Sequence, residues 1–136
     1  MRPSFLVLTP VCVFLGLSTS LASGSPINIS LFFIILIGAI SANISVNMLN
    51  EYYDFKSGLD LNTNKTPFSG GSGALPNHPE IAGLTFILGL LSLLVTIIIG
   101  IYLLLGYGLQ ILPIGLVGVA LVISYTQWLN RLPFLC

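Results

Sequence analysis

The chain has 136 residues, of which 55% are hydrophobic and only 6% are charged, and its mean hydropathy is +1.03. A soluble globular domain carries about 25% charged residues, so this composition excludes one. Disorder is excluded too, because a disordered chain needs low hydrophobicity and high net charge. Basic and acidic residues balance to a net charge of zero, which leaves no basic surplus to bind nucleic acid. The composition therefore predicts an integral membrane protein whose surroundings are the lipid bilayer.

Two long stretches without charge predict the transmembrane helices. They cover residues 3–50 and 81–130, and each has room for two helices of about 20 residues. Small and turn-forming residues divide the first stretch at 23–26 and the second at 106–108. The expected helices are 5–22, 27–49, 82–105 and 109–128. This pattern predicts an all-α, polytopic transmembrane helix bundle.

The first expected helix has a second interpretation. A basic residue precedes its apolar stretch and small residues follow it, as in a secretory signal peptide. The apolar stretch is longer than the usual core of a signal peptide, about 7–15 residues. We therefore favour a retained transmembrane helix.

The basic residues predict the orientation in the membrane. With four helices, the N-terminus, the 50–80 loop and the C-terminus share one side. All the basic residues lie in these segments: Arg2, Lys56, Lys65 and Arg131. Because cytoplasmic segments carry an excess of Lys and Arg, we expect this side to face the cytoplasm across the cell's inner (plasma) membrane.

Amide and acidic side chains recur along the end of the second expected helix. They are Asn43, Asn47, Asn50, Glu51 and Asp54. At about 100° per residue they share one face roughly 100° wide, which we call the polar face. Asparagines by themselves join helices through hydrogen bonds, but ionisable groups in a membrane helix usually face a bundle interior or a water-filled cavity. The pattern therefore favours a functional cavity, although we expect loose packing around it in this chain.

A third acid follows the polar face. Asp60 comes after Asp54, with Gly58 between them as the expected end of the helix. An unwound segment there would bring Asp60 back towards Asp54. Carboxylate and amide oxygens suit Mg²⁺, which takes one or two carboxylates and shares its other positions with water and phosphates. The residues alone leave two alternatives open: a metal–diphosphate site, or acids at a helix end that face water.

A Gly- and Ser-rich segment lies downstream at 65–73. Successive backbone N–H groups in such a segment converge on an anion, and a lysine adds a point charge for phosphate. The expected phosphate contacts are Lys65, Ser69, Gly70 and Gly71. A flexible linker is the alternative, and the neighbouring polar face favours the phosphate-binding interpretation.

Residues 47–60, with the sequence NMLNEYYDFKSGLD, resemble the first aspartate-rich motif of the UbiA superfamily of intramembrane prenyltransferases. The nearest branch contains the 1,4-dihydroxy-2-naphthoate prenyltransferases of menaquinone biosynthesis. Residues 2–5 and the loop 66–73 are similar to members of the same superfamily. The resemblance implies a bundle of about nine transmembrane helices, of which residues 1–136 would supply the N-terminal part.

The resemblance also implies an activity. Members transfer an isoprenoid chain from a prenyl diphosphate to an acceptor, often an aromatic quinone precursor, with Mg²⁺ as cofactor. By matched position, the catalytic and metal-binding residues would be Asn50, Asp54 and Asp60. Asn47, Glu51 and Lys56 would contact the diphosphate, and the metal would act as a Lewis acid on the leaving group. An apolar tunnel between helices would hold the prenyl tail.

This chain departs from the family pattern in two places. Glu51 stands where many members have aspartate, and all four acids lie between 51 and 80, so a second aspartate-rich motif is missing. We therefore expect a truncated copy that is inactive by itself. Two alternatives are one subunit of a split prenyltransferase, completed by a separate C-terminal half, and a non-catalytic membrane protein of four helices.

Overall fold

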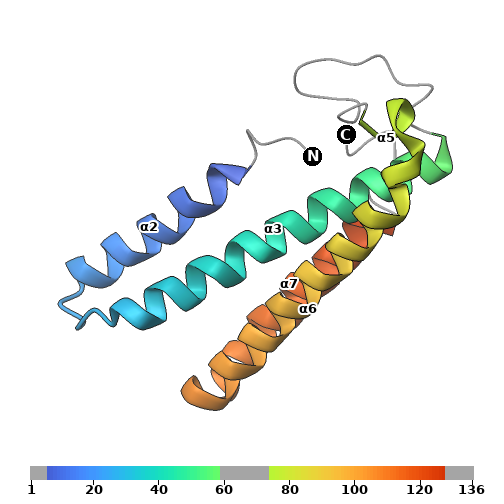
Figure 1. Ribbon diagram of the computed structural model, residues 1–136. Coiled ribbons are helices and arrows are strands. Elements are labelled where there is room, and N and C mark those ends of the chain that lie inside the picture. The colour runs from blue at the N-terminus through green and yellow to red at the C-terminus, as the bar shows by residue number, and fades with distance from the viewer. Residues whose placement is uncertain (1–5, 59–73, 128–136) are drawn as a thin grey trace, which may run out of the picture.

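The computed structural model describes residues 6–58 and 74–127, and in these residues the chain is helical with no strand. Three of the long helices lie alongside the fourth, Ile29–Ser57 (Figure 1), and short turns join Leu8–Ala22 to Ile29–Ser57 and Ala82–Tyr107 to Leu112–Gln127. The elements are α2 (Leu8–Ala22), α3 (Ile29–Ser57), α5 (Ala74–Asn77), α6 (Ala82–Tyr107) and α7 (Leu112–Gln127), with 3₁₀ turns η1 (Pro79–Ile81) and η2 (Leu109–Ile111). The predicted all-α bundle is confirmed.

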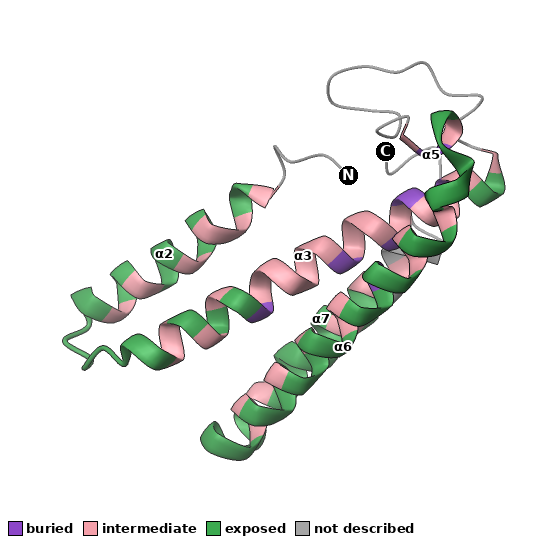
Figure 2. Ribbon diagram, viewed as in Figure 1, coloured by how far each residue is buried: buried purple, intermediate pink, exposed green. Residues whose placement is uncertain are grey.

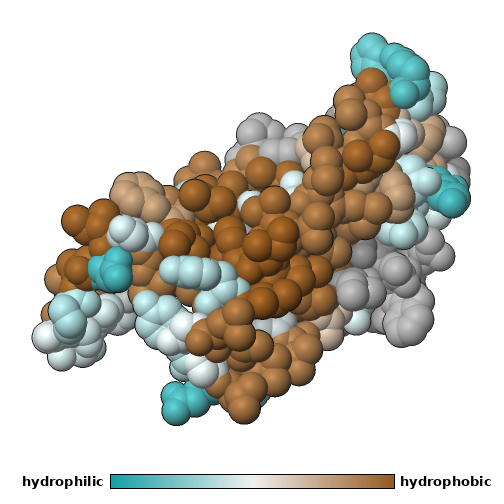
Figure 3. Space-filling view, turned by 60° about the horizontal axis from the view of Figure 1, so that its bottom comes forward, coloured by the Kyte–Doolittle hydropathy of each residue, from teal (hydrophilic) through white to brown (hydrophobic). Residues whose placement is uncertain are grey.

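Two segments are long and apolar enough to cross a membrane: Ile29–Ser57 and Pro79–Tyr107. Two shorter apolar helices, Leu8–Ala22 and Leu109–Val122, accompany them. Large hydrophobic side chains cover much of the visible surface (Figure 3), and Leu105, Leu109 and Ile114 are each more than 70% exposed. Such a surface suits lipid, because the hydrocarbon core of a bilayer is as apolar as these side chains.

Helix α3 is longer than the predicted helix 27–49, because no helix-breaking residue occurs before Gly58. Gly58 has a φ of 75°, in the left-handed region, and its N–H bonds back to the carbonyls of Asp54 and Phe55. A glycine takes this conformation without a Cβ clash, which explains why the helix ends there. The predicted loop 50–80 is therefore helical at both ends, in the last turns of α3 and in α5.

Helix α3 is the centre of the bundle and contacts α2, α6 and α7. Figure 2 shows that the buried residues gather along α3 and near α5. The approach of α3 to α6 depends on small residues. A Cβ added at Gly89 would lie 2.9 Å from Leu49 Cδ2, and one added at Gly38 would lie 3.0 Å from Ile99 Cγ2. Glycines at these points let the two helices pack closely, as is common between membrane helices.

Candidate functional site

Most of the polar face lies on the side of α3 that points away from α6, while Glu51 at its edge lines a cavity with Leu84 and Leu88 of α6. Leu49 marks the α6 side through its contact with Gly89, and the residues of the polar face lie roughly 100° to 200° round the helix from it. Glu51 and Asp54 are each only 7% exposed. The two acids are therefore covered within this chain, and a cavity of about 260 Å³ remains beside Glu51.

The amide of Asn50 holds the carboxylate of Asp54. Asn50 Nδ2 donates to Asp54 Oδ2 at 2.9 Å, as the spacing of four residues on a helix allows. The hydroxyl of Ser57 donates to the backbone carbonyl of Asp54 at 3.1 Å. The structure therefore brings together two of the three predicted metal-binding residues and fixes one carboxylate oxygen.

A second group of hydrogen bonds joins the polar face to α2. Asn47 Nδ2 donates to Asn43 Oδ1 at 2.6 Å and to the backbone carbonyl of Asn43 at 2.8 Å. Asn43 Nδ2 in turn donates to the hydroxyl of Thr9 on α2. Both hydrogen bonds of the Asn47 side chain go to Asn43, which is itself bonded to Thr9 of α2. The orientation of the Asn47 side chain is therefore linked to the contact between α2 and α3.

Lys56 is not brought to the polar face. Its Nζ lies 5.9 Å from the centroid of the Tyr52 ring, and that ring packs on Phe86 of α6 with centroids 4.7 Å apart. Lys56 is roughly 160° round the helix from Asp54 at 100° per residue. Its predicted contact with the diphosphate gains no support from this placement, which favours a cation–π contact instead.

Five predicted site residues lie outside the described residues: Asp60, Lys65, Ser69, Gly70 and Gly71. Within 6–58 and 74–127, no group of three or more His, Cys, Asp or Glu side chains is placed to hold a metal. The described donors are one amide and one carboxylate in contact, Asn50 and Asp54. Such hard oxygen donors fit Mg²⁺, which needs few protein ligands when water and phosphate supply the rest.

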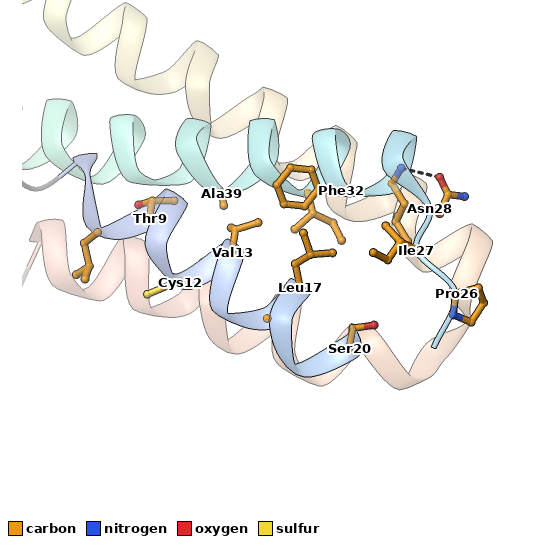
Figure 4. A pocket seen from close by; sticks show the side chains of 14 residues that line it. Thr9, Cys12, Val13, Leu17, Ser20, Pro26, Ile27, Asn28, Phe32 and Ala39 are labelled. Atoms are coloured by element: carbon orange, nitrogen blue, oxygen red, sulfur yellow. Dashed lines mark hydrogen bonds between the residues drawn. The ribbon is translucent and has the colours of Figure 1, made fainter. Parts of the chain in front are cut away.

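The structure also shows two hollows, whose positions and linings the sequence did not reveal. A groove of about 610 Å³ lies between α2 and α3 (Figure 4). Its wall is mostly apolar, and its lining includes Thr9, Cys12, Val13, Leu17, Phe32 and Ala39. Thr9 accepts the hydrogen bond from Asn43, so the groove adjoins the polar face at this residue. A smaller cavity of about 260 Å³ lies beside Glu51.

Long apolar helices and a part-buried amide–carboxylate pair at one helix end define a class, the helical membrane proteins that keep a polar site within the bundle. Comparison with known sequences gives the family. The model of the UbiA prenyltransferase family matches residues 8–136, and the chain belongs to this family. The resemblance found in residues 47–60 is thereby confirmed.

One curated relative is the 1,4-dihydroxy-2-naphthoate octaprenyltransferase of Bacillus subtilis (strain 168). It is 32% identical over 125 residues, which cover 92% of this chain but only 39% of the relative. The chain thus spans about two fifths of the length of that protein. No solved structure matches the chain.

Proposed function

We propose that this chain supplies the first aspartate-rich half of the diphosphate site of a prenyltransferase, which moves an isoprenoid chain from a prenyl diphosphate to an aromatic quinone precursor. The hydrogen bond from the half-buried Asn50 to the buried Asp54, in a chain of the UbiA family, carries the proposal. The aromatic acceptor is inferred from the relative, whose name specifies a dihydroxynaphthoate.

The residues of the polar face have separate tasks in this proposal. Asn50 and Asp54, with Asp60, would hold Mg²⁺, which when bound supplies Lewis-acid stabilisation of the departing diphosphate. The Asn50 amide keeps the Asp54 carboxylate in one orientation, so little reorganisation is needed when charge develops on the diphosphate. Asn47 lies one turn before this pair, oriented by Asn43.

The groove between α2 and α3 suits the hydrocarbon part of the substrate. Its apolar side chains would take up prenyl units that are otherwise exposed to water, at about 0.8 kcal/mol per buried CH₂. The hydrogen-bonded pair Asn43–Thr9 stands between the groove and the acids. A substrate with its chain in the groove would therefore point its diphosphate towards Asp54.

The orientation in the membrane is part of the proposal. The distribution of basic residues favours a cytoplasmic location for the end of α3 and for both termini. A diphosphate ester is soluble and charged at its head, so a site at the cytoplasmic end of α3 is accessible to it. Labelling of Lys56 by a membrane-impermeant amine reagent in right-side-out and inverted vesicles tests this orientation.

Binding of farnesyl diphosphate to the purified chain in detergent tests the diphosphate site. We expect binding to require Mg²⁺ and to weaken at least about tenfold in Asp54→Asn, because a charge-assisted contact is lost. Glu80→Gln is the matched control, since Glu80 is an exposed acid whose carboxylate pairs with the ring of His78. Binding that needs neither Mg²⁺ nor Asp54 would contradict the proposal.

A chimera tests the transfer step. Residues 8–136 would replace the matching segment of the Bacillus subtilis relative, and prenylation of 1,4-dihydroxy-2-naphthoate would be measured in membranes. We expect product from the chimera and a loss of at least about a hundredfold with Asp54→Asn, as for the removal of a group that stabilises developing charge. An active Asp54→Asn chimera would show that Asp54 has no such role.

A further inference from the structure

The groove between α2 and α3 continues past an aromatic ring. Phe32 lines it, and so do residues of α3 on either side of Phe32, Ala39 towards the polar face and Asn28 towards the turn that joins the helices (Figure 4). Phe14 of α2 contacts the Phe32 ring from across the groove, with centroids 5.3 Å apart. The ring therefore divides the groove into a near half beside the polar face and a far half beside the turn.

Gly16 keeps the two halves connected. It lines the groove close to the level of the contact between Phe14 and Phe32, about 3 Å along α2 from Phe14. A Cβ added at Gly16 meets nothing within 4 Å among the described residues, whereas one added at Gly38 or Gly89 meets a side chain of the neighbouring helix. Gly16 thus leaves open space in the groove, where the other two glycines serve a helix contact.

The helices give the reach that a prenyl chain needs along this path. Asn43, which donates to Thr9, lies about 17 Å along α3 from Asp54, and Gly16 lies about 11 Å along α2 from Thr9, at 1.5 Å per residue. Three bonds of an extended backbone span about 3.3–3.6 Å, so the four chain bonds of a prenyl unit span at most about 5 Å. From a diphosphate at Asp54, a farnesyl chain therefore ends in the near half, whereas a hexaprenyl chain extends beyond Gly16.

We propose that Gly16 is a specificity-determining residue, which admits prenyl chains longer than farnesyl to the far half of the groove by leaving the passage beside Phe32 open. The inference rests on the proposed function, in which the diphosphate lies at Asp54. A larger side chain at position 16 closes this passage, and the distal units of a long chain then leave the groove sideways into the lipid. One residue of α2 thereby sets how much of the chain the helices enclose.

Protection of thiols from a maleimide in detergent tests the inference at two positions. Cys12 reports on the near half and Ser20→Cys on the far half, each in a background that lacks the other thiols, because both residues line the groove. We expect hexaprenyl diphosphate to slow alkylation about tenfold at both positions. Farnesyl diphosphate should slow it at Cys12 alone, because its chain ends before the level of Ser20.

Gly16→Leu closes the passage. Hexaprenyl diphosphate should still protect Cys12 about tenfold, but its protection of Ser20→Cys should fall below about twofold. Phe32→Ala in the Gly16→Leu background should restore most of this protection, because it removes the ring beside the passage. Gly100→Leu is the matched control and should change neither value, since Gly100 also has nothing within 4 Å of an added Cβ and lies on α6, outside the groove.

Protection is the ratio of the rates without and with the diphosphate, so shielding of a thiol by the new leucine cancels. Protection of Ser20→Cys that survives Gly16→Leu overturns the inference, as does its absence from the chain that keeps Gly16. In both cases a protected Cys12 leaves the proposed function standing. If neither diphosphate protects Cys12, the groove holds no prenyl chain and the role of Gly16 falls with it. Farnesyl diphosphate binding that still depends on Asp54 then retains the diphosphate site alone.

Discussion

The two sides of α3 are packed in opposite ways. Towards α6, glycines at 38 and 89 bring the backbones together at two points, and only the smaller cavity of about 260 Å³ near α5 interrupts this contact. Towards α2, a groove of about 610 Å³ separates the helices, and the ring contact of Phe14 with Phe32 and the bond from Asn43 to Thr9 cross it. One helix thus has a close-packed side and an open side.

The difference indicates that the α6 side fixes the position of α3, whereas the groove proposed for the prenyl chain lies on the α2 side. Small residues give α3 a fixed position against α6, because close-packed helix pairs tolerate little change in volume. The open side then keeps an apolar groove next to the polar face without losing the position of Asp54.

Gly89→Val tests the close-packed side and should have the largest effect. A Cβ at this position would lie 2.9 Å from Leu49 Cδ2 and 3.3 Å from the backbone nitrogen of Leu49, so the helices must separate. We expect the free energy of unfolding, measured by SDS titration in mixed micelles, to fall by about 2–3 kcal/mol.

Gly100→Val is the matched control for this change. Gly100 lies on the same helix with nothing within 4 Å of an added Cβ, so only the small difference in helix propensity should be seen. Leu49→Ala in the Gly89→Val background should recover part of the loss, since the clash involves this side chain. Equal losses in the two valine variants would show that α3 and α6 do not pack closely.

Cys12 tests the open side. Its thiol is exposed and lines the groove, so in a Cys136→Ser background we expect rapid alkylation by a maleimide in detergent. Farnesyl diphosphate should slow this reaction about tenfold, equivalent to about 1.4 kcal/mol, by filling the groove. A cysteine introduced by Leu105→Cys, at the exposed end of α6, should react with the maleimide at the same rate whether or not farnesyl diphosphate is present. An unprotected Cys12 would place the prenyl chain elsewhere.

Ser45→Ala is a second test of the close-packed side of α3. Ser45 is fully buried, and its hydroxyl has no hydrogen-bond partner among the described residues. An unsatisfied buried hydroxyl costs free energy, so its removal should raise the free energy of unfolding by about 1 kcal/mol. Ser18→Ala, an exposed serine that bonds to the carbonyl of Phe14, should change it by less than about 0.5 kcal/mol. Destabilisation by Ser45→Ala would reveal a partner for this hydroxyl.

The smallest effect is expected for the bond that crosses the open side. A double-mutant cycle with Asn43→Ala and Thr9→Val should give a coupling of about 0.6 kcal/mol, the average for hydrogen bonds between membrane helices. The free energy of unfolding is measured in the same micelles for the unsubstituted chain, the two single variants and the double variant. A coupling of zero would mean that the polar face is not fixed to α2.

The sequence predicted correctly those features that depend on the geometry of a single helix. The spacing of Asn50 and Asp54 placed them on one face, and Gly58 marked the end of α3, because both depend only on helical geometry. The same geometry places Lys56 on the opposite side from Asp54, so that placement was available from the sequence. The roles of these residues remain predictions. The assignment of the helices to a single prenyltransferase domain also remains a prediction.

Features that depend on two helices could not be read in this way. The contact of Gly89 with Leu49 and the groove beside Thr9 require the register of α3 against α6 and α2, which no pattern within one helix specifies. Helix α5 is only four residues long, too short to show a hydrophobic period. The sequence predicted a cavity along the polar face, but the part that α5 plays in the wall beside Glu51 was missed for that reason.

The length of α3 has a consequence for how a substrate arrives. Its 29 residues extend about 44 Å at 1.5 Å per residue, more than the roughly 30 Å of bilayer hydrocarbon. A helix that crosses the membrane at this length sets its polar end among the lipid headgroups while its apolar length follows the acyl chains. An amphiphile with a charged head and a long tail already lies in the same orientation and at the same depth. Capture then becomes a search in two dimensions, in which the bilayer has aligned the ligand with α3 before they meet.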